Sequence, residues 1–144
     1  MLKKDGYYFW IKGEIEHLGN YFNTMEFACK CSNEECLAQK ISIDLIDKLD
    51  WLREASKGPL RINSGYRCAA YQKELADKGI NTVVAKKSTH ELGDAADVMS
   101  SPLSPHELIK YAEIKFKSIG TASNFLHLDL RPAHTDGTPR RWKY

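Results

Sequence analysis

Two segments of the sequence place histidine and aspartate among small or apolar residues, and they constrain the fold more than any other feature. The first, residues 88–97, reads Ser-Thr-His-Glu-Leu-Gly-Asp-Ala-Ala-Asp and contains His90 and Asp97. The second, residues 125–130, reads Phe-Leu-His-Leu-Asp-Leu and contains His127. Two imidazoles and one carboxylate suit a catalytic zinc site, in which three protein ligands leave the fourth position open to water. A fold that carries such a site must bring the two segments together.

The remaining residues of these segments favour strands that a metal ion can approach. Gly93 permits a tight turn after the first histidine, and the two alanines that follow keep the backbone slim. Residues 95–99 are predicted to form a buried strand, and residues 125–130 alternate apolar and polar side chains like a second strand. Residues two apart on a strand share a face, so His127 and Asp129 should point into the same cavity.

Hydrophobic periodicity along the rest of the chain predicts a small α+β domain. At 144 residues, with 42% hydrophobic and 28% charged residues, the sequence is that of one globular domain over 1–144. We expect residues 1–22 to be a peripheral extended segment outside a motif-bearing core of about 23–142. The predicted elements are helices over 41–56, 69–78 and 104–117, strands over 60–63, 95–99 and 125–130, and loops over 81–87 and 131–144.

Charge and hydropathy exclude some classes of partner. A net charge of +2 is too small to indicate a nucleic-acid partner. The N-terminal residues Met-Leu-Lys-Lys-Asp are not followed by an apolar run, and no segment approaches the length of a membrane span. We therefore expect a protein made in the cytoplasm without a signal peptide, with no membrane partner, and monomeric.

The pattern resembles the M15 family of zinc peptidases, which contains D-alanyl-D-alanine carboxypeptidases and dipeptidases and the L-alanyl-D-glutamate endopeptidases of phage lysins. The family signature Ser-x-His-x-x-Gly-x-Ala-x-Asp is matched at every fixed position by residues 88–97, and His127 matches its distal histidine. Residues 62–67, Ile-Asn-Ser-Gly-Tyr-Arg, resemble the family's Ser-Gly-Tyr-Arg segment. The resemblance covers roughly residues 20–142, and several spaced motifs in the right order make it specific.

The resemblance implies a hedgehog/DD-peptidase-like fold, an antiparallel sheet with helices packed on one side. It implies one catalytic zinc ion held by the family's three ligands, here His90, Asp97 and His127, and a peptidoglycan stem peptide as substrate. Arg67 resembles the family arginine that faces the scissile carbonyl, and Ser88 a hydroxyl that holds substrate. Each also has a structural interpretation, because an arginine can cap a helix or form a salt bridge and a serine can stabilise a turn.

The general base is where this sequence departs from many family members. Those enzymes have Glu or Asp three residues before the last zinc histidine, but this chain has Asn124, and an amide cannot accept a proton from water. Asp129 is the candidate catalytic base by strand parity with His127. The alternative is that Asp129 hydrogen-bonds the histidine and orients it. Glu91, next to a predicted ligand, is the reserve candidate.

The four cysteines allow three interpretations. Cys29, Cys31, Cys36 and Cys68 could form two disulfides, a structural site for a second zinc ion, or a set of buried thiols. We expect a cross-link or metal site that ties the N-terminal part of the chain to the rim of the active site. A second zinc site is the less favoured form of that cross-link, since Cys-x-Cys is not the usual Cys-x2-Cys spacing.

Two classes of function follow from the sequence. The first is a zinc peptidase acting on peptidoglycan, a phage or phage-derived lysin that reaches the cell wall after release, or alternatively a D,D-carboxypeptidase acting on wall precursors. The second is a non-catalytic binding module, because the signalling domain of hedgehog proteins resembles this fold. Only the missing acid at position 124 favours the second class. Loss of peptidoglycan turbidity with and without a chelator would distinguish the two.

Overall fold

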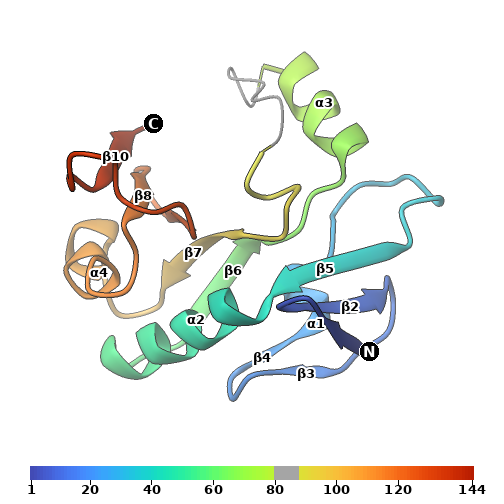
Figure 1. Cartoon of the computed structure of the whole chain (residues 1–144), viewed down its shortest axis with the longest axis horizontal. Helices are drawn as coiled ribbons and strands as arrows, with labels where there is room; N and C mark the ends of the chain where they lie inside the picture. Colours follow the sequence, from blue (N-terminus) through green and yellow to red (C-terminus); the bar gives the residue numbers. More distant parts are fainter. Residues whose placement is uncertain (80–87) are drawn as a thin grey trace.

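The computed structural model describes residues 1–79 and 88–144, so the loop predicted at 81–87 lies outside the described residues. The described residues form short strands with four helices between them (Figure 1). In chain order the elements are β1 (Leu2–Lys4), β2 (Tyr7–Ile11), β3 (His17–Leu18), β4 (Phe22–Asn23), α1 (Thr24–Phe27), β5 (Ala38–Ser42), α2 (Ile43–Ala55), β6 (Leu60–Ser64), α3 (Ala69–Asp77), β7 (Ala95–Ser100), α4 (Pro105–Ala112), β8 (Ser118–Thr121), β9 (Leu126–Asp129) and β10 (Arg140–Lys143).

A five-stranded sheet in the order β10-β8-β9-β7-β6 carries the residues of interest. All its neighbouring strands are antiparallel except β10, which runs parallel to β8. The register places Asp97 of β7 opposite His127 of β9. The other neighbour of β9 is β8, whose Gly120 also lies opposite His127. The predicted strand pair is therefore present, and its register joins the two motif segments directly.

The sheet separates an apolar side from a polar side. Leu126 and Leu128 of β9 and Val98 of β7 are fully buried in the hydrophobic core, together with side chains from α2 and α4. Helices α2 and α4 contact each other, and α4 also contacts β7. Because side chains alternate along a strand, Asp97 and His127 face away from this core. The prediction of a small α+β fold with an antiparallel sheet and helices is confirmed. None of the described helices has the length and apolar character needed to span a membrane.

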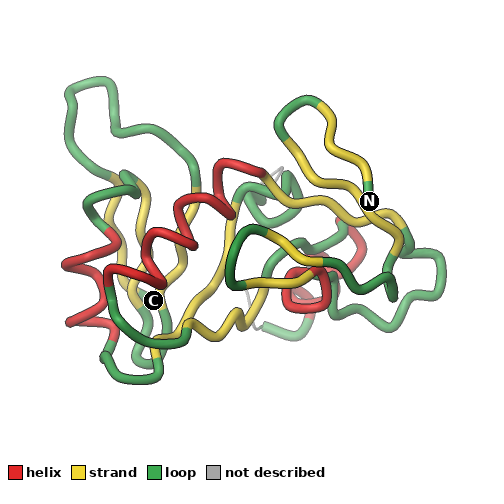
Figure 2. Tube along the Cα trace, turned by 90° about the horizontal axis from the view of Figure 1, so that it is seen from below, coloured by secondary structure: helices red, strands yellow, loops and turns green. Residues whose placement is uncertain are grey.

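The N-terminal part of the chain forms its own sheet, in the order β1-β2-β5. Residues 1–22 are largely extended, as expected, but Tyr8, Trp10 and Leu18 are buried and belong to the hydrophobic core. These residues therefore contribute to the interior as well as to an outer layer. The two chain ends lie toward opposite ends of the molecule (Figure 2).

The predicted helices are present with different bounds. Residues 41–42 belong to β5, and Ser42 is the N-cap of α2, its hydroxyl accepting a hydrogen bond from the Leu45 amide. Helix α4 begins at Pro105 after the predicted Ser104 cap but ends at Ala112, before the predicted end at 117. The helix is shorter because the chain tightens into turns at Ile114 and then enters β8.

The prediction that residues 131–144 are only a loop is wrong. Arg140–Lys143 forms β10, the edge strand parallel to β8. Trp142 of this strand lies across Gly120, where an added Cβ would come within 2.5 Å of the indole ring. Only a residue without a side chain permits this approach, so the edge strand depends on a packing contact that local propensity does not reveal.

Candidate metal centre and active site

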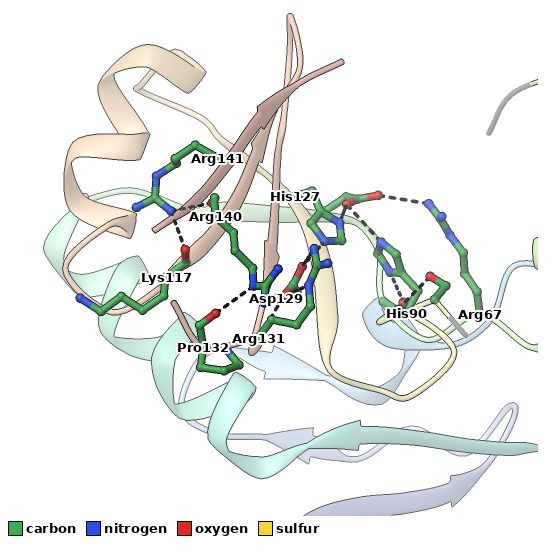
Figure 3. A network of polar contacts seen from close by, with 12 residues as sticks. Arg67, His90, Lys117, His127, Asp129, Arg131, Pro132, Arg140 and Arg141 are labelled. Atoms are coloured by element: carbon green, nitrogen blue, oxygen red, sulfur yellow. Dashed lines mark hydrogen bonds and ion pairs between the residues drawn. The ribbon is translucent and has the colours of Figure 1, made fainter. Parts of the chain in front are cut away.

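Three residues from separate segments meet on the polar side of the sheet. His90 comes from the turn before β7, Asp97 from β7 itself and His127 from β9. One ligand atom from each lies within 4.8 Å of the others, and all three side chains are buried. Figure 3 shows the two imidazoles side by side, with Arg67 on one flank and Asp129 on the other. The three residues predicted as metal ligands are therefore brought together.

The turn that presents His90 is organised by residues of the predicted motif. The Ser88 hydroxyl accepts a hydrogen bond from the His90 amide at 3.2 Å, and its carbonyl accepts from the Glu91 amide at 3.0 Å. Gly93 closes the turn with a φ of +78°, which favours glycine. Ser88 thus stabilises the turn, and its role in holding substrate stays a prediction.

His90 is held in the tautomer that leaves Nε2 free. Its Nδ1 lies 2.7 Å from the Gly65 carbonyl oxygen, which can only accept, so Nδ1 must carry the proton. Nε2 is fully buried without a hydrogen-bond partner, 3.2 Å from Asp97 Oδ1. Burial lowers the pKa of His90, so the ring is neutral. A buried lone pair without a donor is the arrangement that a metal ion would satisfy.

His127 is oriented in the complementary way. Its Nε2 lies 2.8 Å from Asp129 Oδ2, and its Nδ1 lies 3.0 Å from Asp97 Oδ1. Burial lowers the pKa of His127, but the hydrogen bonds with Asp129 and Asp97 outweigh it, and the net effect is a raised pKa. When Nε2 donates to Asp129, Nδ1 of the neutral ring presents a lone pair toward Asp97. The Nδ1 lone pair and Asp97 Oδ1 are both acceptors, and at 3.0 Å they need a cation or a proton between them.

Asp129 is fully engaged with its neighbours. It is 1% exposed, and besides His127 it accepts hydrogen bonds from Arg131, from the backbone amide at 2.9 Å, from Nε at 3.1 Å and from Nη2 at 3.0 Å. Burial raises the pKa of Asp129, but these donors outweigh it and hold the pKa below its usual range. Asp129 contacts the edge of the imidazole that faces away from Asp97. Asp129 therefore lies on the other side of the His127 ring from Asp97.

Arg67 lies beside the carboxylate of Asp97. Its Nη2 donates to Asp97 Oδ2 at 3.1 Å, Nε donates to Ser64 Oγ at 2.8 Å, and Nη1 donates to Gln72 Oε1 at 3.2 Å. Burial raises the pKa of Asp97, but His90 and His127 outweigh it, so the pKa lies below its usual range and the group is ionised. Three of the five guanidinium N–H groups are used in these contacts with described residues.

The C-terminal strand adds residues that the sequence analysis did not assign to the site. The Trp142 ring lies 5.4 Å from the His127 ring, and the Arg131 guanidinium lies 5.3 Å from the centre of the same indole. Tyr144 lies next to Trp142, with ring centres 6.4 Å apart. Arg-Arg-Trp-Lys contains a single apolar side chain, so no alternation in the sequence marks this strand. Asn124 is exposed before β9, and the reserve base Glu91 is half-buried in the turn.

Comparisons with known proteins agree with this geometry. Searches among curated proteins and among solved structures give no significant match. One protein family does match, the one described as Peptidase M15, and the matched region, residues 20–129, includes Arg67, the first motif segment and the second as far as Asp129. Because this match covers most of the sequence, the chain belongs to the peptidase M15 family.

Proposed function

We propose that this peptidase uses zinc and hydrolyses peptide bonds in bacterial peptidoglycan stem peptides. The observation that carries the zinc assignment is the buried Nε2 atom of His90, which lacks a hydrogen-bond partner and points toward Asp97 and His127. A buried polar atom left unpaired is costly, and a cation at this position would remove the cost. Two imidazoles and one carboxylate form a ligand set typical of catalytic zinc.

The atoms that would hold zinc are His90 Nε2, Asp97 Oδ1 and His127 Nδ1. When bound, zinc supplies Lewis-acid polarisation of the scissile carbonyl and lowers the pKa of water. Both imidazoles are already fixed in the tautomers that ligation needs, His90 by the Gly65 carbonyl and His127 by Asp129. Such partners behind metal-binding histidines orient the rings and raise their basicity.

Arg67 is proposed to bind the reacting carbonyl. Its contact with Asp97 places it beside the ligand atoms, and its guanidinium N–H groups can donate to the oxygen that becomes negative during attack. Its bonds to Ser64 and Gln72 hold the guanidinium in one orientation before substrate binds. Ser88, in the turn next to His90, is proposed as a second contact for the substrate.

Asp129 is proposed as a positioning residue that acts through His127. Its oxygens accept from His127 and Arg131, and the imidazole separates it from Asp97. The competing role as catalytic base requires direct contact with the reacting water. Glu91 directly follows His90 in the sequence, and its carboxylate does not bind His127 or Arg131. We propose to test Glu91 as the proton acceptor.

The cell wall is the proposed place of action, after release from the cell in which the protein is made, as for a phage lysin. A D,D-carboxypeptidase acting on wall precursors is the alternative within the same chemistry. Asn124, where many relatives carry an acid, favours a second candidate, a zinc-containing binding module without activity. These three functions differ in the products they release from peptidoglycan.

The test is incubation of the purified chain with a defined muropeptide, followed by mass spectrometry of the products. We expect cleavage within the stem peptide, loss of cleavage on adding a chelator, and recovery with zinc. His127→Ala should be inactive, whereas His106→Ala, which changes an exposed histidine on α4, should behave as the unmodified protein. Release of only a terminal D-alanine would identify the carboxypeptidase. Binding of the muropeptide without any product would overturn the peptidase proposal.

A further inference from the structure

A second group of metal-binding side chains lies next to the catalytic candidate. We propose that Cys29, Cys31, Cys36 and Cys68, here called the cysteine cluster, bind a structural zinc ion. Three of them lie in the segment between α1 and β5, and Cys68 is the N-cap residue of α3. All four are free thiols, and their sulfur atoms lie within 4.8 Å of one another.

The spacing of the sulfur atoms fits a tetrahedral metal site better than disulfides. Cys31 Sγ and Cys68 Sγ are 3.8 Å apart. A disulfide requires about 2.05 Å. Four sulfurs at the zinc–sulfur distance of about 2.3 Å from one centre are about 3.8 Å apart along each tetrahedral edge. The observed separation therefore matches two ligands of one ion.

Each sulfur atom also receives an N–H donor. Cys29 Sγ accepts from the Cys68 amide at 3.4 Å, and Cys68 Sγ in turn accepts from the Tyr71 amide at 3.4 Å. Cys36 Sγ accepts from Gln39 Nε2 at 3.4 Å, and Cys31 Sγ lies 3.7 Å from the ammonium group of Lys12. Thiolates need such donors, because four of them exceed the charge of one divalent cation. The donors thus stabilise the sulfur atoms in their metal-binding form.

The surrounding chain needs a stabilising link of this kind. Residues 28–37 form neither helix nor strand, and within this segment Cys31 and Cys36 are only half-buried. A segment this irregular has few backbone hydrogen bonds to hold it. A structural metal site supplies folding free energy directly and fixes such a loop.

The cysteine cluster adjoins the groups that organise the catalytic candidate. Cys68 follows Arg67 directly, and the Arg67 amide donates to the His90 carbonyl at 3.2 Å. The Tyr66 amide donates to the Phe27 carbonyl at 2.8 Å, so the end of β6 is also joined to the end of α1. A zinc ion in the cluster would thus fix the residue that directly follows Arg67. Binding of this ion does not depend on the proposed peptidase activity.

Metal analysis of the full chain under reducing conditions tests the proposal. We expect His127→Ala to lose catalytic zinc but to retain one zinc ion per chain, held by the cysteine cluster. Cys36→Ser should lose that ion, whereas Ser32→Ala, an exposed change in the same segment, should retain it. Cobalt substituted into His127→Ala should show the thiolate-to-cobalt charge-transfer absorption of a sulfur-ligated centre.

A second measurement removes any dependence on how the Cys36→Ser protein folds. Titration of the unmodified protein with an organomercurial that binds thiolates should release the cluster zinc in proportion to the thiols modified. The proposal is overturned if His127→Ala binds no zinc and its four thiols react freely with a thiol reagent. It is also overturned if the mass of the freshly purified protein shows two disulfides. If the unmodified protein and His127→Ala each bound a single zinc ion, held by the cysteine cluster, this inference would stand and the proposed function would be contradicted.

Discussion

Asp129→Asn distinguishes the two roles of this aspartate. The carboxylate accepts from His127 Nε2 on Oδ2 and from Arg131 on both oxygens. An asparagine has the same shape but only one accepting oxygen, so its NH2 group must face a donor of either His127 or Arg131. Loss of the partner behind a metal-binding histidine weakens metal affinity by roughly 10- to 100-fold. We therefore expect zinc affinity to fall by about 1.4–2.7 kcal/mol.

The assay is a zinc titration against a competing chelator, followed by muropeptide cleavage at saturating zinc. A positioning residue predicts weaker zinc binding and activity that largely returns when zinc is saturating. Asp136→Asn, which changes an exposed aspartate in the C-terminal turn, should affect neither quantity. Unchanged zinc affinity together with abolished turnover would refute the reasoning and assign Asp129 as the catalytic base.

Three further predictions concern the site and its support. Arg67→Ala should retain zinc and lower kcat by about 100-fold or more, the scale of one lost oxyanion donor; unchanged turnover would make Arg67 purely structural. Gly120→Ala should destabilise the fold by about 1–3 kcal/mol in urea unfolding, because its Cβ would collide with Trp142, and an unchanged midpoint would contradict that contact. Leu128→Ala should cost about 2–5 kcal/mol, since the side chain is fully buried; a loss below this range, measured in the same way, would show that the core collapses around the gap.

Short-range patterns predicted many of the elements. The cap, proline and glutamate at 104–107 predicted the start of α4 correctly, because capping depends on neighbours in the sequence. The strand β10 was not predicted, since it depends on pairing with β8. The end of α4 was predicted too late, because the chain turns at Ile114 before it enters β8. Similarly, the aromatic residues of β2 showed no sign of which would enter the core, because that depends on pairing with β5.

The sequence by itself determined which residues of the two motif segments share a face, since alternation along a strand is a local property. The sequence was also enough to identify His90, Asp97 and His127 as one candidate set of metal ligands. Only the tertiary structure decided which nitrogen of each imidazole is free, because the partners that hold the rings, Gly65 and Asp129, act through hydrogen bonds made in the folded chain. It also decided that four cysteines from two segments meet at one point, since no local rule connects Cys68 with residues 29–36.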